Sequence, residues 1–176
     1  MDLSKISIGE NPPEDVNAII ENPMGGDPVK YELDKNSGAM FVDRFLHTAM
    51  YYPGNYGFIP HTLSGDGDPV DILVMGRTPV MPKAVLRCRP VGVLMMEDEA
   101  GLDEKIIAVP SDKLHPYHAD VQSIKNIRPI HRDQIEHFFE HYKDLEQGKW
   151  VKNLEWQDAD RAKTLILEGI ERAKQS

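Results

Sequence analysis

The stretch GDGDPVDILVMG, Gly65 to Gly76, places three aspartates within six positions and then continues directly as an apolar segment. Asp66, Asp68 and Asp71 repel one another at this spacing, and a low-dielectric neighbour strengthens the repulsion. The glycines and Pro69 predict a turn before residue 70, and VDILVM predicts a buried strand after it. The three carboxylates are therefore either fully solvated or gathered around something positive.

Two interpretations of this turn stay open from the stretch alone. Hard cations such as Mg²⁺ and Ca²⁺ prefer carboxylate oxygens, and converging aspartates can supply them. The alternative is an acidic surface turn that is held by its own Asx hydrogen bonds. A second acidic stretch, MEDEAGLDEKIIAV, carries Asp98 and Asp103 around a glycine turn, with Lys105 entering the next strand. A charged hairpin tip alone is weak evidence for a functional site, and this stretch becomes informative only in combination with the first one.

Composition limits the classes of protein that the chain can belong to. It has 176 residues, 40% of them hydrophobic and 28% charged, which predicts a single domain over residues 1–176 with a sizeable core. The formal net charge is -9, and the basic residues form no runs. A surface this acidic repels a phosphate backbone, so a nucleic-acid partner is not expected.

The cysteine count and the hydrophobic runs predict where the protein works. A single cysteine, Cys88, excludes an internal disulfide and a cysteine-based zinc site, and its place in LRCRPVGVL predicts a small buried thiol. The N-terminal segment has no apolar run of signal-peptide length, and no later run approaches a membrane span. We therefore expect a soluble, cytoplasmic protein without a membrane partner.

Residues 16–109 are typical of short strands separated by Gly and Pro. Segments VNAII, VKYEL, AMFVDRFL, VDILVM, AVLRCRPVGVLMM and KIIAVP follow one another at close spacing. In VKYEL, Lys30 and Glu32 share one face, and in AMFVDRFL, Arg44 shares a face with apolar residues, which is unusual for a solvated arginine. The segment YYPGNYGFIPHTL sets its tyrosines among turn residues. This part of the chain predicts a β-barrel or sandwich.

The last third of the chain changes to a helical period. One apolar stripe contains Ile135, Phe138, Phe139, Tyr142 and Leu145, with Gly148 as the expected stop. A second stripe follows at Ala162, Leu165, Ile166, Ile170 and Ala173, with Asp158 as its expected cap. Strands first and helices last predict the α+β class, mainly β, with two C-terminal helices packed beside a barrel.

Basic and phenolic residues suited to phosphate oxygens lie beside apolar neighbours along the chain. They are Lys30, Arg44, Tyr52, Tyr56, Tyr142 and Lys143. Guanidinium and ammonium groups and a tyrosine hydroxyl can all donate to phosphate. Taken one at a time, each is more typical of a packed tyrosine or a solvated charge than of a phosphate-binding residue. The chain has no Walker A loop and no GxGxxG, so a nucleotide-binding fold has no support.

A rival motif lies on the first predicted helix. The segment HFFEH, from His137 to His141, matches the H-x-x-E-H pattern of inverted zinc peptidases. Its histidines are one turn apart and can share a metal. A five-residue pattern is weak among seven histidines, and the two phenylalanines are packing residues. A histidine pair at a packing or subunit surface is the favoured interpretation.

The acidic stretches and the phosphate-binding set together resemble one family. Asp66-Gly-Asp-Pro-Val-Asp71-Ile is similar to the fingerprint of the family I soluble inorganic pyrophosphatases. Further segments resemble blocks of the bacterial members: DPVKYELDKNSGAMFVDRFL, AMYYPGNYGFIPHTL, RCRPVGVLMMEDEAGLDEKIIAVP and HFFEHYKDLEQGKWV. The resemblance covers nearly the whole chain, from about Glu14 to Lys174.

The resemblance implies a fold, a reaction and an assembly. The fold is an OB-like five-stranded barrel with helices beside it. The reaction is hydrolysis of inorganic pyrophosphate to two phosphates with several Mg²⁺ ions per site, for which Mn²⁺ or another divalent ion can substitute. The bacterial members are hexamers, so a homohexamer built as a dimer of trimers is expected. The helix with His137 and His141 resembles their subunit contact region, which weakens the zinc peptidase hypothesis.

The resemblance also implies a metal set at matching positions. Asp66, Asp71 and Asp103 are expected to hold the first ion, with Asp71 shared with a second. Asp98, Asp103 and Glu21 are expected to serve the ions that arrive with the substrate. Metals at these positions make the crowded aspartates of the opening stretch tolerable, because they neutralise them.

The remaining expected roles concern the substrate. Asp68 is expected to orient and deprotonate the attacking water. Phosphate oxygens are expected to be bound by Lys30, Arg44, Tyr56, Tyr142 and Lys143. Close support is expected from Glu32, Tyr52 and Lys105. Pyrophosphate has almost no apolar surface, so cations and hydrogen-bond donors must bind it. The alternative in a different class is a non-catalytic OB-type module that binds cations or oligonucleotides.

Overall fold

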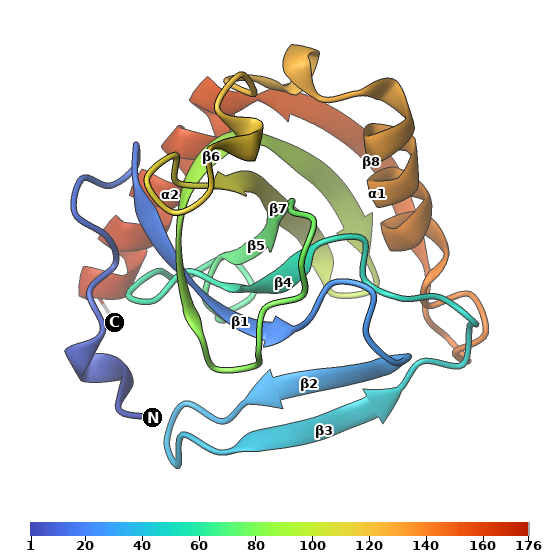
Figure 1. Ribbon diagram of the computed structural model, residues 1–176. Helices are drawn as coiled ribbons and strands as arrows, with labels where there is room; N and C mark the ends of the chain where they lie inside the picture. The colour runs from blue at the N-terminus through green and yellow to red at the C-terminus, as the bar shows by residue number, and fades with distance from the viewer. Residues whose placement is uncertain (176) are drawn as a thin grey trace.

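The structure, a computed structural model, describes residues 1–175 except for the side chain of Asn153 (Figure 1). Its strands are β1 (Val16–Asn22), β2 (Val29–Leu33), β3 (Met40–Phe45), β4 (Asn55–Phe58), β5 (Asp71–Val74), β6 (Val85–Asp98), β7 (Gly101–Pro110) and β8 (Val151–Asp158). Its helices are α1 (Pro129–His141) and α2 (Ala159–Gln175), with 3₁₀ turns η1 (Leu3–Lys5), η2 (Pro116–His118) and η3 (Ile124–Asn126). The prediction of strands first and helices last is confirmed except at β8, which lies between the two helices.

Five strands close into a barrel in the order β1-β4-β5-β7-β6, because β6 pairs back onto β1. The pairing of β5 with β7 is parallel, and the other pairs in the ring are antiparallel. Closure leaves the barrel strands without free edges, which removes a route to aggregation. The predicted OB-like five-stranded barrel is confirmed.

The longest strand, β6, serves the barrel at one end and an added strand at the other. Its first residues, Val85–Cys88, pair with β1, and its last residues, Gly92–Asp98, pair with β8. The register against β7 shifts between Pro90 and Gly92. Such an irregularity bends and twists a strand, and proline is tolerated at one because it has no ladder N–H to offer.

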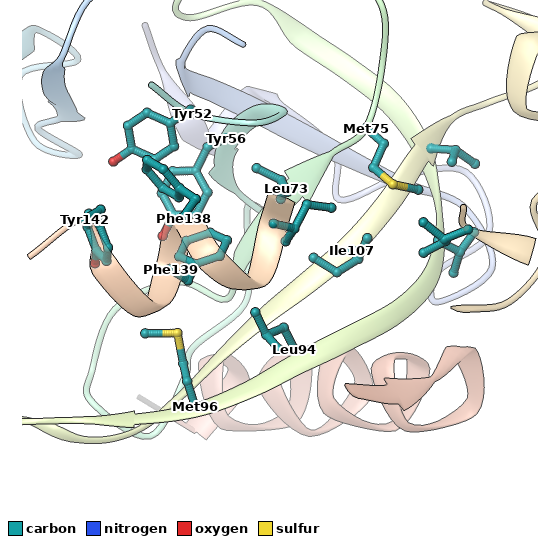
Figure 2. Packing of buried hydrophobic residues seen from close by; sticks show 14 of the residues in the cluster. Tyr52, Tyr56, Leu73, Met75, Leu94, Met96, Ile107, Phe138, Phe139 and Tyr142 are labelled. Atoms are coloured by element: carbon teal, nitrogen blue, oxygen red, sulfur yellow. The ribbon is translucent and has the colours of Figure 1, made fainter. Parts of the chain in front are cut away.

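Strands β5 and β7 are buried on both faces, which explains their continuous apolar runs. Leu73 and Ile107 belong to a core cluster that includes Phe138 and Phe139 of α1 (Figure 2). The alternate residues, among them Ile72 and Ile106, belong to a second cluster with α2. Cys88 is fully buried in that second cluster, as predicted. Both helices therefore cover the barrel from different sides.

The hairpin of β2 and β3 forms a separate two-stranded sheet below the barrel in Figure 1. The amide side chain of Asn22, at the end of β1, fastens it. Asn22 Oδ1 accepts from the N–H of Tyr31 at 2.7 Å, and Nδ2 donates to the Tyr31 carbonyl at 3.0 Å. Lys30 and Arg44 lie opposite each other across this hairpin, which places both on its inner side near the barrel.

The first helix is shorter than the sequence predicts. It ends at His141, and the chain continues to Gly148 in single turns such as Asp144 N–H to His141 O and Glu146 N–H to Lys143 O. Leu145, expected on the apolar stripe, is 64% exposed. The stripe was extended too far because a tight turn and a helix carry the same short-range periodicity. The second stripe is confirmed at its buried residues, Ala162, Leu165 and Ile166.

Strand β8 was not predicted. Its sequence, VKNLEWQD, forms the edge of the sheet, paired only with β6 among the described strands, and Val151, Leu154 and Trp156 pack against the core. Asp158 ends this strand directly before α2, and its Oδ1 accepts from the N–H groups of Ala159 and Ile124. The segment YYPGNYGFIPHTL is likewise more regular than expected, since Asn55–Phe58 form β4. No helix within residues 1–175 has the length and apolarity needed to cross a bilayer.

Candidate active site

A pocket of about 190 Å³ lies where the β2–β3 hairpin, the strand ends of the barrel and the turns after α1 meet. All fourteen residues predicted from the sequence line it: Glu21, Lys30, Glu32, Arg44, Tyr52, Tyr56, Asp66, Asp68, Asp71, Asp98, Asp103, Lys105, Tyr142 and Lys143. The chain thus brings together side chains that are up to 122 positions apart in sequence. The structure shows that these side chains line one pocket, and the separate role of each residue stays a prediction.

Asp71 is the carboxylate at the centre of the pocket. It begins β5 and lies directly opposite Lys105 in the parallel β5–β7 register. Its Oδ2 accepts from the Tyr56 hydroxyl at 2.5 Å and from Lys105 Nζ at 2.6 Å. Because two barrel strands hold Asp71 and Lys105 in register, their spacing is fixed by the sheet and does not depend on a loop.

The ammonium group of Lys105 bridges two carboxylates. Its Nζ also donates to Asp103 Oδ1 at 2.5 Å. Lys105 is only 3% exposed, and burial alone would favour its neutral form. Asp71, Tyr56 and Asp103 outweigh that burial and raise the pKa of Lys105, so it is cationic at neutral pH.

The end of the β6–β7 hairpin supplies a second buried ion pair. Lys143 Nζ donates to Asp98 Oδ2 at 2.6 Å, and both side chains are almost fully buried. Lys143 lies two residues after α1, which ends at His141. Because the helix ends there, Tyr142 and Lys143 both line the pocket. At the rim, Glu99 Oε1 lies 2.5 Å from Lys149 Nζ. Burial raises the pKa of Glu99, but the hydrogen bond from Lys149 prevails and lowers it to about 2.

The cations of the β2–β3 hairpin share one partner. Asp43 Oδ2 lies 3.1 Å from Lys30 Nζ and 3.0 Å from Arg44 NH1. Arg44 Nε lies 3.0 Å from Glu146 Oε1 as an ion pair without hydrogen-bond geometry. This wall of the pocket is therefore formed by both strands of the β2–β3 hairpin and by the turns after α1.

The aspartate turn itself is ordered by its own atoms. Asp66 Oδ1 accepts from the N–H of Asp68 at 2.9 Å, and Ser64 N–H donates to the Asp68 carbonyl at 2.6 Å. This is the Asx-type turn that was the alternative interpretation of the stretch, and it coexists with the pocket. Asp68 has 68% of its side chain exposed, with Lys35 Nζ 2.9 Å from its Oδ1. Asp66 and Asp68 are both exposed, whereas only 31% of the Asp71 side chain is exposed.

Glu21 lies at the buried end of the pocket with Glu32 on the neighbouring hairpin strand. Its Oε1 accepts from the Leu33 N–H at 2.8 Å. Burial raises the pKa of Glu21 to about 7, against the effect of that hydrogen bond, and the negative charge of Asp71 adds to the rise. This carboxyl gains most from a cation placed beside it.

Three tyrosines bring hydroxyl groups to the edge of the apolar core. The rings of Tyr52 and Tyr56 stack at 5.1 Å, and Tyr142 stacks on Phe138 at the same centroid separation (Figure 2). Burial raises the pKa of each tyrosine above its usual value, with nearby tyrosine or aspartate charge adding to it. All three are protonated donors at neutral pH, on rings that packing holds in place.

The donor set fits a divalent cation in chemical type. Seven carboxylates line the pocket, and oxygen is the ligand that hard cations prefer. Within residues 1–175, no three carboxylate, imidazole or thiol side chains converge closely enough to enclose an ion. The Lys105 contacts to Asp71 and Asp103 suggest the reason, since an ammonium group holds the space between two of the expected ligands. A bound ion must displace or move that group.

Sequence reasoning missed several residues of the site. Lys35, Phe58, Pro69, Phe139 and Lys149 also line the pocket. Lys35 is in the turn between β2 and β3, and no periodicity marks a turn lysine as inward. Lys149 follows Gly148, where only the nearby acidic stretch at residues 97–99 offered a complementary charge. Asp43, beside Arg44 in the quoted stretch, was the one missed partner that sequence adjacency could have identified.

The histidine pair of α1 is not part of this pocket. His137 and His141 have ring centroids 4.6 Å apart, but His141 Nδ1 is 2.7 Å from Asp144 Oδ2. Among the residues that the structure describes, no third metal ligand joins them. The zinc peptidase hypothesis therefore has no structural support.

The fold and the pocket define a class: a closed OB-like barrel whose mouth presents clustered cations and carboxylates, the chemistry that binds a small, highly charged anion together with divalent ions. The chain belongs to the inorganic pyrophosphatase family, whose model matches residues 18–174. Two inorganic pyrophosphatases are close relatives. That of Rhodospirillum rubrum is 65% identical over 97% of this chain and 95% of its own length, and that of Caulobacter vibrioides is 62% identical over 100% and 99%.

A solved structure supports the same assignment. The inorganic pyrophosphatase from Thermus thermophilus superposes with a TM-score of 0.92 at 43% identity, and the match covers 99% of both chains. The family implies dependence on divalent metal ions, and the metal ligands expected from the sequence are among the residues that line the pocket. The family resemblance drawn from the sequence is confirmed.

Proposed function

We propose that this protein hydrolyses inorganic pyrophosphate to two phosphates. The observation that carries the proposal is the pocket itself, where carboxylates and cations from six strands, the aspartate turn and the turns after α1 converge in a chain of the pyrophosphatase family. Pyrophosphate is small and has several negative charges. A pocket of about 190 Å³ lined mainly by charged groups matches it in size and in charge type.

Magnesium is the expected cofactor, held by Asp66, Asp71, Asp98, Asp103 and Glu21. When bound, divalent ions lower the pKa of a coordinated water and neutralise the charge of phosphate oxygens. Mn²⁺ or another divalent ion can substitute, because the donors are carboxylates without a soft ligand. The buried Glu21 supports this assignment, since burial raises its pKa to about 7 even though Lys30 acts in the opposite direction, and a bound cation would favour its charged form.

Asp68 is proposed as the general base that accepts the proton of the attacking water. Its carboxylate is exposed at the pocket mouth, on a turn that the Asp66 side chain orders. Asp71, by comparison, is an expected metal ligand and accepts hydrogen bonds from both Tyr56 and Lys105. Position and accessibility both favour Asp68 for contact with water.

The substrate oxygens are proposed to be bound by Lys30, Arg44, Tyr56, Tyr142 and Lys143. The tyrosines stay protonated because burial raises their pKa, so they donate hydrogen bonds throughout the neutral range. Lys30 and Arg44 lie side by side across the hairpin and present two cations to one face of the substrate. Support is proposed from Glu32, Tyr52 and Lys105, of which Lys105 fixes the position of Asp71.

The test of the reaction is phosphate release from pyrophosphate. We expect rapid release with Mg²⁺, almost none in excess chelator, and almost none from ATP under the same conditions. ATP serves as the control because it contains the same phosphoanhydride bond on a larger molecule. No release with any divalent ion would contradict the proposal and favour the alternative, a non-catalytic module that binds cations or oligonucleotides.

The role of Asp68 has its own test. We expect Asp68→Asn to lower the turnover number by about a hundredfold or more, in the range of a lost general base. The substitution keeps the size of the side chain, so Mg²⁺ binding by calorimetry and the melting temperature should change little. Asp112→Asn, on a surface aspartate that pairs with Arg89 outside the pocket, is the matched control. A variant at Asp68 that keeps most of its turnover would refute the assigned base.

The whole chain, residues 1–176, is proposed to act as one domain, working in the cytoplasm as a homohexamer built as a dimer of trimers. The family match over residues 18–174 supports the single domain, and the resemblance to bacterial members supports the hexamer. Light scattering on the purified chain tests the assembly. A monomer at micromolar concentration would contradict it, whatever the result of the activity assay.

A further inference from the structure

A second charged pocket, of about 420 Å³, lies on another side of the molecule and shares no lining residue with the candidate active site. The loop after β5, the 3₁₀ turn η2 and the start of α1 form its walls. The residues that matter to its chemistry are Arg77, His118, Asp120, Arg128 and His131. We call it the arginine pocket.

The arginines of the chain are distributed unevenly with respect to their partners. Five of the eight form ion pairs with carboxylates: Arg44, Arg87, Arg89, Arg161 and Arg172. The other three, Arg77, Arg128 and Arg132, have no ion pair with any residue in the range 1–175. Two of these line the arginine pocket, and Arg132 lies on α1 one position after its lining residue His131. In a chain of net charge -9, uncompensated guanidinium groups are concentrated in one place.

A buried histidine adds an unsatisfied polar atom. His118 lines the arginine pocket and is only 7% exposed, and its Nε2 has no hydrogen-bond partner among the described residues. A buried nitrogen without a hydrogen-bond partner destabilises the folded protein unless a group in the pocket forms a hydrogen bond with it. Burial lowers the pKa of His118, and His131, His115 and Arg77 lower it further, with Asp120 acting in the opposite direction. The imidazole is therefore neutral at neutral pH and can donate a hydrogen bond from a ring N–H.

The cationic groups are held in place before any ligand arrives. The guanidinium of Arg77 lies over the Tyr117 ring at 4.5 Å, and the Tyr117 ring meets His118 edge-on at 4.9 Å. Arg128 is the N-cap of α1 and provides no side-chain cap. Pro129 has no N–H and the His131 N–H donates to the Arg128 carbonyl, so this helix end contributes the positive end of its dipole more than free N–H groups. Asp120 is the one carboxylate among the described lining residues.

We propose that the arginine pocket binds a phosphate group, supplied either by a small organic phosphate monoester or by free inorganic phosphate. Guanidinium groups match phosphate oxygens in geometry and in charge, and a helix N-terminus favours the same anion. The pocket is about twice as large as the candidate active site, and part of its wall is apolar, from Met75, Val121 and Ile127. These two features favour the monoester, whose carbon skeleton can lie on that apolar wall.

The test is calorimetric titration of the full chain with two probes, adenosine monophosphate and inorganic phosphate. The chain carries Lys30→Ala and Arg44→Ala, with chelator present, to suppress phosphate binding at the candidate active site. We expect saturable binding at one site per chain. Adding Arg77→Ala and Arg128→Ala should weaken it at least about tenfold, since two charge-assisted contacts are lost. Arg161→Ala, which removes the same charge from α2, is the matched control and should leave binding unchanged.

A variant with the opposite effect guards against a merely structural explanation. Asp120→Asn removes the one described carboxylate of the pocket and should tighten binding several-fold. Tighter binding of the monoester than of inorganic phosphate would identify the monoester as the ligand, and equal affinity would identify free phosphate. The absence of saturable binding by either probe, or binding that survives Arg77→Ala and Arg128→Ala, would overturn the proposal. Pyrophosphate hydrolysis, measured in a chain with only the two pocket substitutions, should keep its rate.

Discussion

At the scale of single residues, the candidate active site is a set of buried charges that neutralise one another. Lys105, Lys143 and Lys35 each hold a carboxylate that is also an expected metal ligand or base. In the absence of divalent ions these pairs remove the repulsion among the aspartates. The proposed function would require divalent ions to replace these ammonium groups beside the carboxylates.

Loss of the central ammonium group should expose that repulsion. We expect Lys105→Met to destabilise the protein by about 3 kcal/mol in chelator, because breaking a buried pair leaves its carboxylates unpaired. Added Mg²⁺ should recover much of this loss by neutralising Asp71 and Asp103. Urea unfolding with and without Mg²⁺ measures both effects. Lys125→Met, at an exposed position, is the control, and equal losses in chelator and in Mg²⁺ would contradict the explanation.

Glu21 gives a prediction for pH. Burial raises its pKa from 4.5 to about 7, so the folded protein holds a proton that the unfolded chain releases. That contribution to stability is complete below pH 4.5 and is lost as pH rises to 7 and beyond. We expect Glu21→Gln to be more stable than wild type by about 3 kcal/mol above pH 7 in chelator. Urea unfolding from pH 4 to 8 checks it, and a difference that does not depend on pH would contradict it.

At the scale of elements, close backbone contacts decide where strands can lie. A Cβ on Gly57 of β4 would collide with the Ile19 carbonyl of β1, so the barrel closes at this point only with glycine. We expect Gly57→Ala to cost about 2 to 3 kcal/mol, as overpacking of a core does. Gly65→Ala is the control, since nothing lies within 4 Å of its Cβ position. Thermal unfolding of both variants measures the difference, and a similar loss at Gly65 would refute the steric explanation.

The elements also show how far the sequence predicts the structure. Alternation and Gly/Pro punctuation predicted the strands that have a buried face, and the 3.6 period predicted the buried residues of both helices. The end of α1 was missed because turns i to i+3 continue the same spacing, and Leu145 was counted as apolar without a surface to pack on. Strand β8 was missed because its apolar residues, Val151, Leu154 and Trp156, do not alternate regularly, and its register against β6 shifts within the same stretch.

The candidate site was predicted in two different ways. The spacing of Asp66, Asp68 and Asp71 indicated a cation site on physical grounds, with a surface turn as an equal alternative. Lys30, Arg44 and the tyrosines acquired roles only through the family resemblance, since each is also typical of a packed or solvated residue. Neither the spacing of residues nor the family resemblance identified Lys35, because its contact with Asp68 joins two turns that are 33 positions apart.

At the scale of the whole molecule, the charge distribution couples stability to divalent ions. The chain has a net charge of -9, and its candidate active site gathers seven carboxylates from distant parts of the chain. Ions that bind there bind only the folded state, since the unfolded chain separates these groups. Each bound ion should therefore add about 1.4 kcal/mol for every tenfold rise in Mg²⁺ above its dissociation constant.

We accordingly expect the free energy of unfolding to rise linearly with the logarithm of Mg²⁺ concentration, at constant ionic strength. Asp71→Asn should flatten this slope, because Asp71 is expected to be shared by two ions. Asp112→Asn, on a surface aspartate paired with Arg89, should not change it. Urea unfolding across a Mg²⁺ series, with KCl as the compensating salt, measures the slopes. If the three proteins shared one slope, the stabilisation would arise from general screening of the acidic surface, and the carboxylates of the pocket would not act as a metal site.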